Sequence, residues 1–515
     1  MTGIRDFNGD GVRDVLLSYQ YYTAPYTPDL RVGIFSGADG SQLWWRSTYH
    51  RFLRDGGDMN GDGSGEFLAM VPTAIFTPGW VLWNAIEVRS PSLGGQLLWT
   101  AYGLSATNYA FDILGDVDTD GDGSPNIVTI SRGYLPPPTY AHVGANVFVY
   151  NNRGKELYRL DMSALGFEPI SLGKMGDLDG DGCDEFVVGC NDIGPARGAV
   201  HLISGRSGAI LRTGYGLLPG DKTFFNATSV GDWDGDGVED FAAFPWWSAS
   251  RLMATAWSGA TASVIRTIPE YGESVVASED LDRDGVRDLV LGSDYPVLAP
   301  HIYGRVIAIS GRDATPLWKV ENDWGVYPSN AGWAWRSVGL GTRPGRGYPS
   351  LAWLDTNFVL AAQPIANATG RVRMFDSAYL AQGPVSGSPC ASSGPMPLIG
   401  ARATATGSRV TIAKGAPGAY AWLNLSLGNP TQYQGVALPL ALDPFGLQGC
   451  QMHVGPDAAF FRQLGTTGID RGYAAVNLPR YLSTYFGTMV QAQWLLYDPV
   501  SGWFGATEKH QLRFQ

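Results

Sequence analysis

A nine-residue acidic pattern recurs six times within the first 288 residues of this chain, and it constrains the fold more than any other feature. The pattern is D-x-[DN]-x-D-G-x-x-[DEN], and successive copies begin 48 to 60 residues apart. A period of this length is typical of proteins built from repeated supersecondary units. The copies are DFNGDGVRD from Asp6, DMNGDGSGE from Asp58, DTDGDGSPN from Asp118, DLDGDGCDE from Asp177, DWDGDGVED from Asp232 and DLDRDGVRD from Asp280.

Each repeat contains four short β-rich runs separated by turns of Gly, Asp, Ser and Pro. The third run repeatedly ends in a small-residue turn, as in IFSGADG, LISGRSG and AISGRDA. Four-stranded units of ~50 residues favour the blades of a β-propeller over solenoid coils. Residues 337–354 can be aligned with residues 229–244 but lack the carboxylates, which indicates a seventh unit. The sequence therefore predicts an all-β fold with a seven-bladed propeller over residues 1–384.

The six acidic loops and their period resemble the FG-GAP (VCBS) repeat family, whose calcium-loop β-propeller forms the N-terminal head of integrin α subunits. The resemblance covers roughly residues 1–380. It implies a propeller whose ligand side is the face opposite the calcium loops.

A second domain is expected after the acidic period stops. Residues 383–397 are rich in Gly, Pro and Ser, which is typical of a domain boundary. Short alternating runs follow, such as RVTIAKG and MVQAQWLLYD, and they predict a smaller β-sandwich-like domain over residues 388–515. This part is similar to C-terminal modules of secreted bacterial repeat proteins.

The acidic loops predict bound Ca²⁺. Carboxylates at positions 1, 3 and 5 of a tight turn, a backbone carbonyl at position 7 and a side chain at position 9 supply the six to eight oxygens that Ca²⁺ prefers. Solvated surface turns are the alternative for a single copy, but six copies in phase favour about six calcium ions. The expected side-chain ligands are Asp6, Asn8, Asp10, Asp14, Asp58, Asn60, Asp62, Glu66, Asp118, Asp120, Asp122, Asn126, Asp177, Asp179, Asp181, Glu185, Asp232, Asp234, Asp236, Asp240, Asp280, Asp282, Asp284 and Asp288.

The charge of the chain agrees with metal ligation. The formal net charge is −12, and 21 of the 48 acidic side chains are expected ligands in the six loops. An acidic chain without basic blocks is an unfavourable partner for nucleic acid. No apolar run reaches the ~18 residues of a membrane-spanning helix.

The four cysteines predict one disulfide. Cys183 and Cys190 flank one extended run and lie too far apart to bridge, whereas Cys390 and Cys450 both fall in the second domain and can pair. Two free buried thiols are the alternative for that pair. The six histidines show no metal spacing, and no nucleophile elbow, HExxH or P-loop motif is present.

The N-terminus suggests a truncated start. The first acidic loop begins five residues after Met1, so the first blade is expected to lack its own first strand, and no signal peptide opens the chain. Calcium loops and a disulfide both favour an extracellular or cell-surface location.

Two functions of different classes fit these features. The first is a non-enzymatic, calcium-stabilised binding or adhesion protein that presents a propeller face to a protein or glycan ligand. The alternative is a calcium-dependent polysaccharide lyase or glycoside hydrolase, whose carboxylate pair leaves no fixed spacing in a sequence. Segments that join the second and third strands are rich in aromatics, which either pack between blades or form a ligand platform. The candidate ligand-binding residues are Tyr22, Tyr26, Trp80, Tyr134, Tyr140, Trp246, Trp247 and Tyr295.

Overall fold

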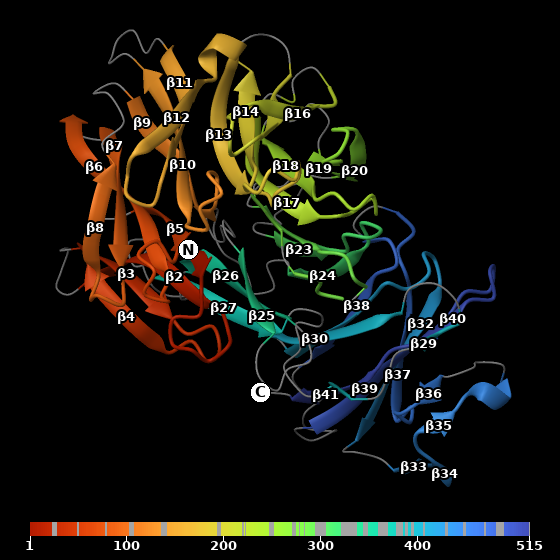
Figure 1. Cartoon of the computed structure of the whole chain (residues 1–515). Coiled ribbons are helices and arrows are strands. Elements are labelled where there is room, and N and C mark those ends of the chain that lie inside the picture. The colour runs from red at the N-terminus through yellow and green to blue at the C-terminus, as the bar shows by residue number, and fades with distance from the viewer. Residues whose placement is uncertain are drawn as a thin grey trace.

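The computed structural model is an all-β chain in which seven small sheets follow one another and a larger sheet assembly ends the chain (Figure 1). Among the described residues, no helix is long and apolar enough to cross a membrane. The structure describes the whole chain except residues 23–27, 49–50, 78–79, 102–107, 135–141, 193–196, 219–220, 222, 247–251, 270–273, 278, 283, 294–304, 321–336, 343–348, 359–368, 377–384, 387–389, 393–395, 405–406, 428–430, 446–449, 468–469, 480–488 and 514–515.

Six of the seven small sheets have four antiparallel strands in chain order. The first three sheets comprise β1 Thr2–Ile4, β2 Asp14–Tyr22, β3 Pro28–Phe35 and β4 Gln42–Ser47; β5 Arg51–Gly57, β6 Glu66–Thr77, β7 Trp80–Ser90 and β8 Gln96–Ala101; β9 Asn108–Val117, β10 Asn126–Tyr134, β11 His142–Tyr150 and β12 Glu156–Asp161. A short 3₁₀ helix, η1 Ser163–Leu165, follows. The next three comprise β13 Phe167–Lys174, β14 Phe186–Asp192, β15 Ala199–Ile203 and β16 Ile210–Tyr215; β17 Thr223–Gly231, β18 Asp240–Trp246, β19 Leu252–Trp257 and β20 Val264–Pro269; β21 Ser274–Ala277, β22 Leu289–Ser293, β23 Arg305–Ile309 and β24 Pro316–Val320.

The seventh sheet lies where the degenerate repeat predicted it. Its described part has three strands, β25 Ser337–Thr342, β26 Pro349–Phe358 and β27 Thr369–Asp376. The first strands of neighbouring sheets contact one another from β1 through β5, β9, β13 and β17 to β21, and β25 contacts β1. The sheets are therefore propeller blades arranged in a ring with their first strands innermost (Figure 1). The predicted propeller fold is confirmed.

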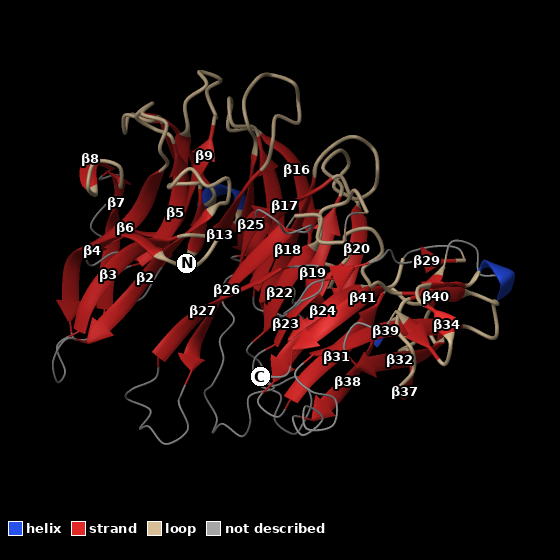
Figure 2. Cartoon of the chain, turned by 90° about the horizontal axis from the view of Figure 1, so that it is seen from below, coloured by secondary structure: helices blue, strands red, loops and turns tan. Residues whose placement is uncertain are grey.

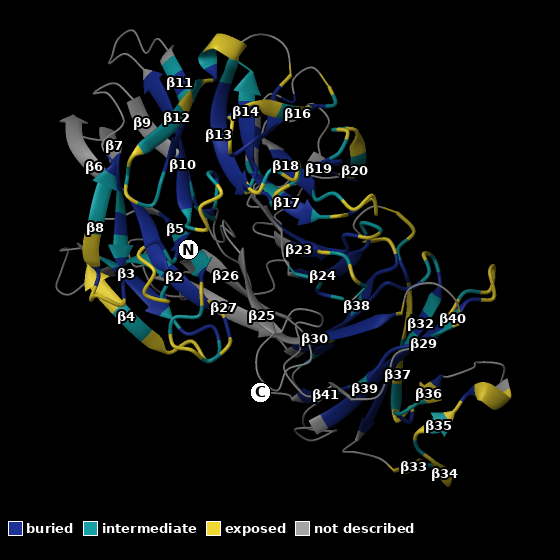
Figure 3. Ribbon diagram, in the orientation of Figure 1, coloured by how far each residue is buried: buried dark blue, intermediate teal, exposed yellow. Residues whose placement is uncertain are grey.

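The hydrophobic core lies between blades, because successive side chains of a strand point to opposite faces of its sheet. In β14, Phe186 and Val188 belong to a buried cluster shared with the third blade, whereas Val187 belongs to one shared with the fifth. In β22, Leu289 and Leu291 pack toward the fifth blade in the same way. Figure 3 shows the buried strands in dark blue. Because of this alternation of side chains, each blade packs against the blade before it and the blade after it.

The first blade corrects one expectation from the sequence. It does not lack its first strand, because β1 pairs antiparallel with β2 through Thr2↔Leu16, Gly3↔Val15 and Ile4↔Asp14. The strand has only three residues, which is too short to show an alternating pattern in the sequence. Ile4 is buried and packs in the cluster between the first and second blades.

The C-terminal part contains a seven-stranded sheet and a three-stranded sheet. The larger sheet runs β28-β41-β39-β32-β37 with β29 and β40 at its side, and the smaller runs β30-β31-β38. Buried side chains of both sheets, such as Val410 and Trp494, share one cluster, so the two sheets enclose a core as in a sandwich. The elements are β28 Val385–Ser386, β29 Cys390–Ala391, β30 Leu398–Thr404, β31 Gly407–Ala413, β32 Tyr420–Leu427, β33 Gln432–Tyr433, β34 Val436–Ala437, β35 Leu440–Ala441, η3 Asp443–Phe445, β36 Gln451–Met452, β37 Ala458–Gln463, β38 Ala474–Pro479, β39 Met489–Tyr497, β40 Phe504–Ala506 and β41 Lys509–Arg513.

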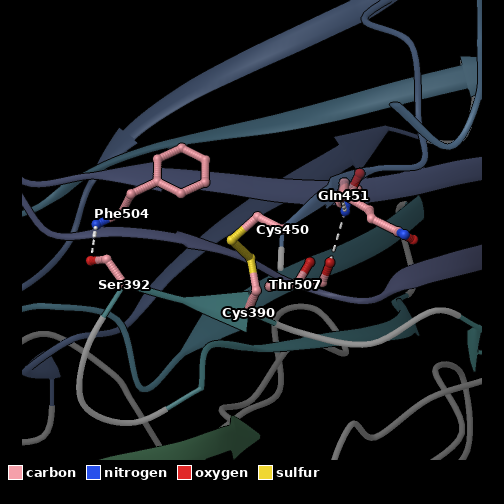
Figure 4. Close-up of a disulfide and its surroundings, with 7 residues drawn as sticks. Cys390, Ser392, Cys450, Gln451, Phe504 and Thr507 are labelled. Atoms are coloured by element: carbon pink, nitrogen blue, oxygen red, sulfur yellow. Dashed lines mark hydrogen bonds between the residues drawn. A yellow bond between two sulfur atoms is a disulfide. The ribbon is translucent and has the colours of Figure 1, made fainter. Parts of the chain in front are cut away.

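A disulfide joins Cys390 to Cys450, with 5.3 Å between their Cα atoms (Figure 4). Cys390 lies in β29, and Cys450 directly precedes β36. The bond therefore fixes the start of the C-terminal part to a segment 60 residues further along the chain. Cys183 and Cys190 are free and buried.

The turns between third and fourth strands lie directly against the loops between first and second strands. Four of these turns carry a Ser-Gly pair, and a Cβ on the glycine would lie only 1.9 to 2.1 Å from a loop carbonyl oxygen. Real Cβ atoms essentially never approach closer than 3.0 Å, so only glycine fits. The glycine and carbonyl pairs are Gly37 with Arg13, Gly205 with Asp184, Gly259 with Glu239 and Gly311 with Arg287.

We predict that Gly259→Ala lowers the free energy of unfolding by more than about 2 kcal/mol, because the added methyl group pushes the turn off the loop. Gly65→Ala is the control, since a Cβ there meets its nearest atom at an ordinary 3.5 Å and should change stability by less than about 0.5 kcal/mol. Scanning calorimetry of both variants measures the difference. Equal melting midpoints would contradict the close approach.

Candidate metal loops

Each acidic loop folds around the carboxylate of its first residue. In the fifth loop, Asp232 Oδ1 accepts hydrogen bonds from the backbone N–H groups of Gly235 and Asp236, at 2.7 and 3.1 Å. Asp232 Oδ2 accepts one from Gly237 N–H at 2.9 Å. Both glycines have left-handed backbone angles, with φ of 80° and 87°, which a residue with a side chain rarely adopts. This geometry explains the D-x-x-G-x-G spacing of the motif.

The ninth residue of each loop ties the loop to the blade. All six of these side chains belong to fully buried residues, and each accepts a hydrogen bond from the backbone N–H of the second loop residue at 2.5 to 2.7 Å. In three loops, the second carboxylate oxygen also accepts the N–H of the close-packed turn glycine. These pairs are Asp14 with Gly37, Asp240 with Gly259 and Asp288 with Gly311, at 2.9 to 3.0 Å.

The role of the Ser-Gly turn was missed at the sequence level. The turn follows the ninth loop residue by 18 to 22 positions in four of the repeats, and this regular spacing was the available signal. Its serine also reaches the loop, because Ser36 Oγ lies 3.3 Å from Asp10 Oδ2 and donates to it. In the second blade Ser92, two residues after the end of β7, donates to Asp62 at 2.8 Å.

Burial makes the negative charge of the ninth residue costly. Loss of solvation raises the pKa of Glu185 to about 7 and that of Asp240 to about 6, despite the backbone hydrogen bonds that act in the opposite direction. The same cause raises the pKa of Asp14 and Glu66. A bound cation would offset this cost, because an opposite charge nearby favours the ionised carboxylate.

The structure brings three carboxylates together in each of four loops. In every group, one oxygen from each residue lies within 4.8 Å of the others. In the first two loops the third position is asparagine, and Asn8 and Asn60 instead donate to Asp10 and Asp62 at 2.9 and 3.1 Å. The four groups are Asp118, Asp120 and Asp122; Asp177, Asp179 and Glu185; Asp232, Asp234 and Asp240; and Asp280, Asp282 and Asp288.

Two carboxylate oxygens in these groups test whether a cation fits. Asp120 Oδ1 and Glu185 Oε1 are buried and have no hydrogen-bond partner. A buried acceptor without a partner is costly unless an ion or water satisfies it. All-oxygen groups of this kind suit Ca²⁺, which accepts flexible, irregular coordination, better than Mg²⁺. The four groups are therefore consistent with calcium sites.

A cavity of about 520 Å³ lies between the second and third loops. Its lining combines loop residues Asp58 and Asp118 with the basic side chains of Arg5 and Lys174. Arg5 forms an ion pair with Asp116 at 2.6 Å, and Lys174 forms one with Asp184 at 3.3 Å. The cavity is therefore lined by both acidic and basic side chains, and it lies beside two candidate calcium loops. In Figure 2 the tan loops of the blades gather at one end of the strands.

Four of the predicted aromatic ligand residues lie at strand ends away from these loops. The second strand of each blade begins at an acidic loop, so its far end lies on the opposite side of the propeller. Tyr22, Tyr134 and Trp246 end β2, β10 and β18, and Trp80 begins β7. The side chains of these four residues, and the whole of Tyr26, Tyr140, Trp247 and Tyr295, lie outside the described residues.

Comparison with known proteins supports distant integrin similarity. No protein-family model matches the chain. The chain is 26% identical to integrin alpha-V of Gallus gallus over 299 residues, which are 55% of this chain and 23% of that protein. It is 26% identical to integrin alpha-4 of Xenopus laevis over 175 residues, 30% of this chain and 16% of that protein. The chain thus spans less than a quarter of the curated relatives it matches.

Solved structures with a similar arrangement are more distant. They include the exotype rhamnogalacturonan lyase YesX (12% identity, TM-score 0.36, 98% of this chain and 88% of that one) and Bacillus licheniformis rhamnogalacturonan lyase PL11 (12%, 0.37, 98% and 88%). A third is the Dos1 propeller (9%, 0.34, 74% and 86%). The repeated acidic loops, the ring of four-stranded sheets and the sequence similarity together make this chain similar to the FG-GAP-type β-propeller of integrin α subunits, with a C-terminal β domain after it.

Proposed function

We propose that the chain is a non-enzymatic, calcium-stabilised extracellular binding or adhesion protein that presents a propeller face to a protein or glycan ligand. The observation that carries this proposal is the geometry common to the six loops. Each loop places a buried acidic or amide side chain at the junction of the first and second strands, and four of the loops bring three carboxylates together there. The loops are built to hold cations that stiffen the blades.

The proposed division of the chain is a propeller over residues 1–384 and a second domain over residues 388–515. The pairing of β28 with β41 adds residues 385–386 to the sheet of the second domain. The Cys390–Cys450 disulfide supports an extracellular setting, because structural disulfides persist in oxidising compartments. Extracellular calcium modules bind with Kd of about 10⁻⁴–10⁻³ M.

Two surfaces are candidates for the ligand. The aromatic segments at the far ends of the second strands are the platform expected from the integrin resemblance, since aromatic rings stack on sugars and anchor protein interfaces. The cavity beside Arg5 and Lys174 lies on the loop side. An adhesion role favours the aromatic side, where the ligand does not compete with the metal loops.

The cavity also supports a second candidate function. A polysaccharide lyase or glycoside hydrolase needs charged groups that converge on a bound sugar. Arg5, Lys174 and Asp116 meet in the cavity beside two calcium loops. Rhamnogalacturonan serves as the test substrate for this second candidate function.

We predict that calcium raises the melting midpoint of the propeller by many degrees. At 100-fold excess over Kd, each site that binds only the folded state adds ~2.7 kcal/mol to the free energy of unfolding. The double variant Asp234→Asn/Asp236→Asn removes two expected ligands of the fifth loop and should reduce the calcium-dependent shift by one site's contribution. Scanning calorimetry in calcium and in EDTA measures both effects.

Glu156→Gln is the matched control, because Glu156 is a carboxylate on β12 outside the loops that pairs with Arg159 at 3.0 Å. It should leave the calcium-dependent shift unchanged. A propeller transition that stays at the same temperature after EDTA treatment would show that the loops are solvated turns.

A binding screen against glycans and extracellular proteins distinguishes the two functions. We expect a ligand that binds in calcium, is lost in EDTA, and is released chemically unchanged. The matched assay incubates the protein with rhamnogalacturonan and follows the ultraviolet absorbance of an unsaturated product. Product formation that stops in Arg5→Ala or Lys174→Ala would establish the lyase and contradict the non-enzymatic proposal.

A further inference from the structure

The sixth acidic loop is covered in a way that the fourth and fifth are not. The third residue of the motif, Asp179 in the fourth loop and Asp234 in the fifth, is exposed. The equivalent Asp282 side chain has no exposed surface at all. Asp282 also belongs to the carboxylate group of its loop, together with Asp280 and Asp288. One side chain of a group that should hold an ion is therefore sealed from solvent.

The cover is a lysine from the second domain. Lys414 directly follows β31, and its ammonium group forms an ion pair with the Asp282 carboxylate. The Lys414 Nζ atom also lies 3.2 Å from Asp284 Oδ2 and 3.5 Å from Ser310 Oγ. Only 5% of the Lys414 side chain is exposed. The ammonium group thus contacts two of the four carboxylates expected to bind the ion.

The backbone at Lys414 supports a fixed placement. Its φ of 56° lies in the left-handed region, which is uncommon for a residue other than glycine. Such a conformation persists only when the surrounding contacts determine it. Here the ion pairs with the sixth loop and the burial of the side chain supply those contacts.

Arginines beside the loops do not explain the difference. Arg312, from the turn of the sixth blade, lies 3.2 Å from Asp284 Oδ2. Arg206 makes the equivalent contact with Asp181 in the fourth loop at 3.1 Å, and it leaves Asp179 exposed. These arginines lie more than half exposed at the rims of their loops. Of these three basic side chains, only that of Lys414 is buried.

Apolar packing holds the second domain in position for this contact. Leu281, Val290 and Trp318 of the sixth blade share one buried cluster with residues of both C-terminal sheets. Near this cluster, the buried Lys319 of β24 pairs with Asp470 and lies 4.7 Å from the ring centre of Tyr473. The second domain therefore packs on the sixth blade through a shared hydrophobic core. This packing places the Lys414 side chain against the sixth loop.

We infer that the Lys414 ammonium takes the cation position of the sixth loop, so that domain docking and calcium binding at this loop exclude each other. The inference rests on the proposal that the acidic loops bind calcium. Two cations cannot share Asp282 and Asp284 within a few ångströms without strong repulsion. The loaded protein then holds five loop ions instead of six, and the charge of the sixth loop is balanced from within the chain.

The test is the number of calcium ions bound by the full chain at saturation, measured by equilibrium dialysis with atomic absorption. The wild type should hold five loop ions and Lys414→Met should hold six. Lys414→Arg keeps a cation and should hold five. Arg206→Met is the matched control at the fourth loop and should also hold five, because that loop keeps its ion with or without the arginine.

Equal, non-zero counts in the wild type and Lys414→Met would overturn the inference. Absence of binding in both proteins would instead refute the calcium proposal, and the exclusion with it. A second measurement tests the ion pair between Lys414 and Asp282 in the absence of calcium. In EDTA, a double-mutant cycle of Lys414→Met and Asp282→Asn should show that the two substitutions are less damaging together than the sum of each alone; additive effects would contradict the contact.

Discussion

A buried polar side chain at the junction of the first two strands, a carboxylate in five of the six loops, is the constraint on which this propeller depends. In each of the first six blades, a loop joins the first strand to the second. The carboxylate of its first residue accepts hydrogen bonds from the backbone of the loop, and the side chain of its ninth residue is buried. The ninth side chain holds the second loop residue in all six loops and the Ser-Gly turn in three. Burial alone makes this charge unfavourable, so a cation completes the arrangement. In those three blades the loop thereby joins the first two strands to the turn between the third and fourth strands.

The blades then assemble through apolar contacts that the loops do not supply. Alternating residues of each strand pack toward the preceding and following blades, which distributes the core around the ring. The sixth blade shares a further cluster with the C-terminal domain. Ionic and apolar contacts thus have separate roles. The loops stiffen each blade, the clusters join the blades, and one cluster joins the propeller to its neighbouring domain.

The repeat period and the motif spacing predicted much of this structure because both are local in sequence. A glycine needed for a left-handed turn, an alternating strand and an Asp-rich loop are each recognisable within about a dozen residues. The propeller and its loops could therefore be predicted from the sequence. The three-residue strand Thr2–Ile4 could not, because three residues carry no period. The cover of Asp282 by Lys414 could not either, since 132 positions separate them and only the docked domain brings them together.

The most direct test of this account is a crystal structure of the chain grown in calcium, with anomalous scattering used to locate the ions. The account predicts a calcium peak enclosed by the carboxylates of each of the first five loops, in contact with the ninth residue or with the oxygens left without partners at Asp120 and Glu185. Loops that hold only water, with no anomalous peak at any of the five positions, would contradict it.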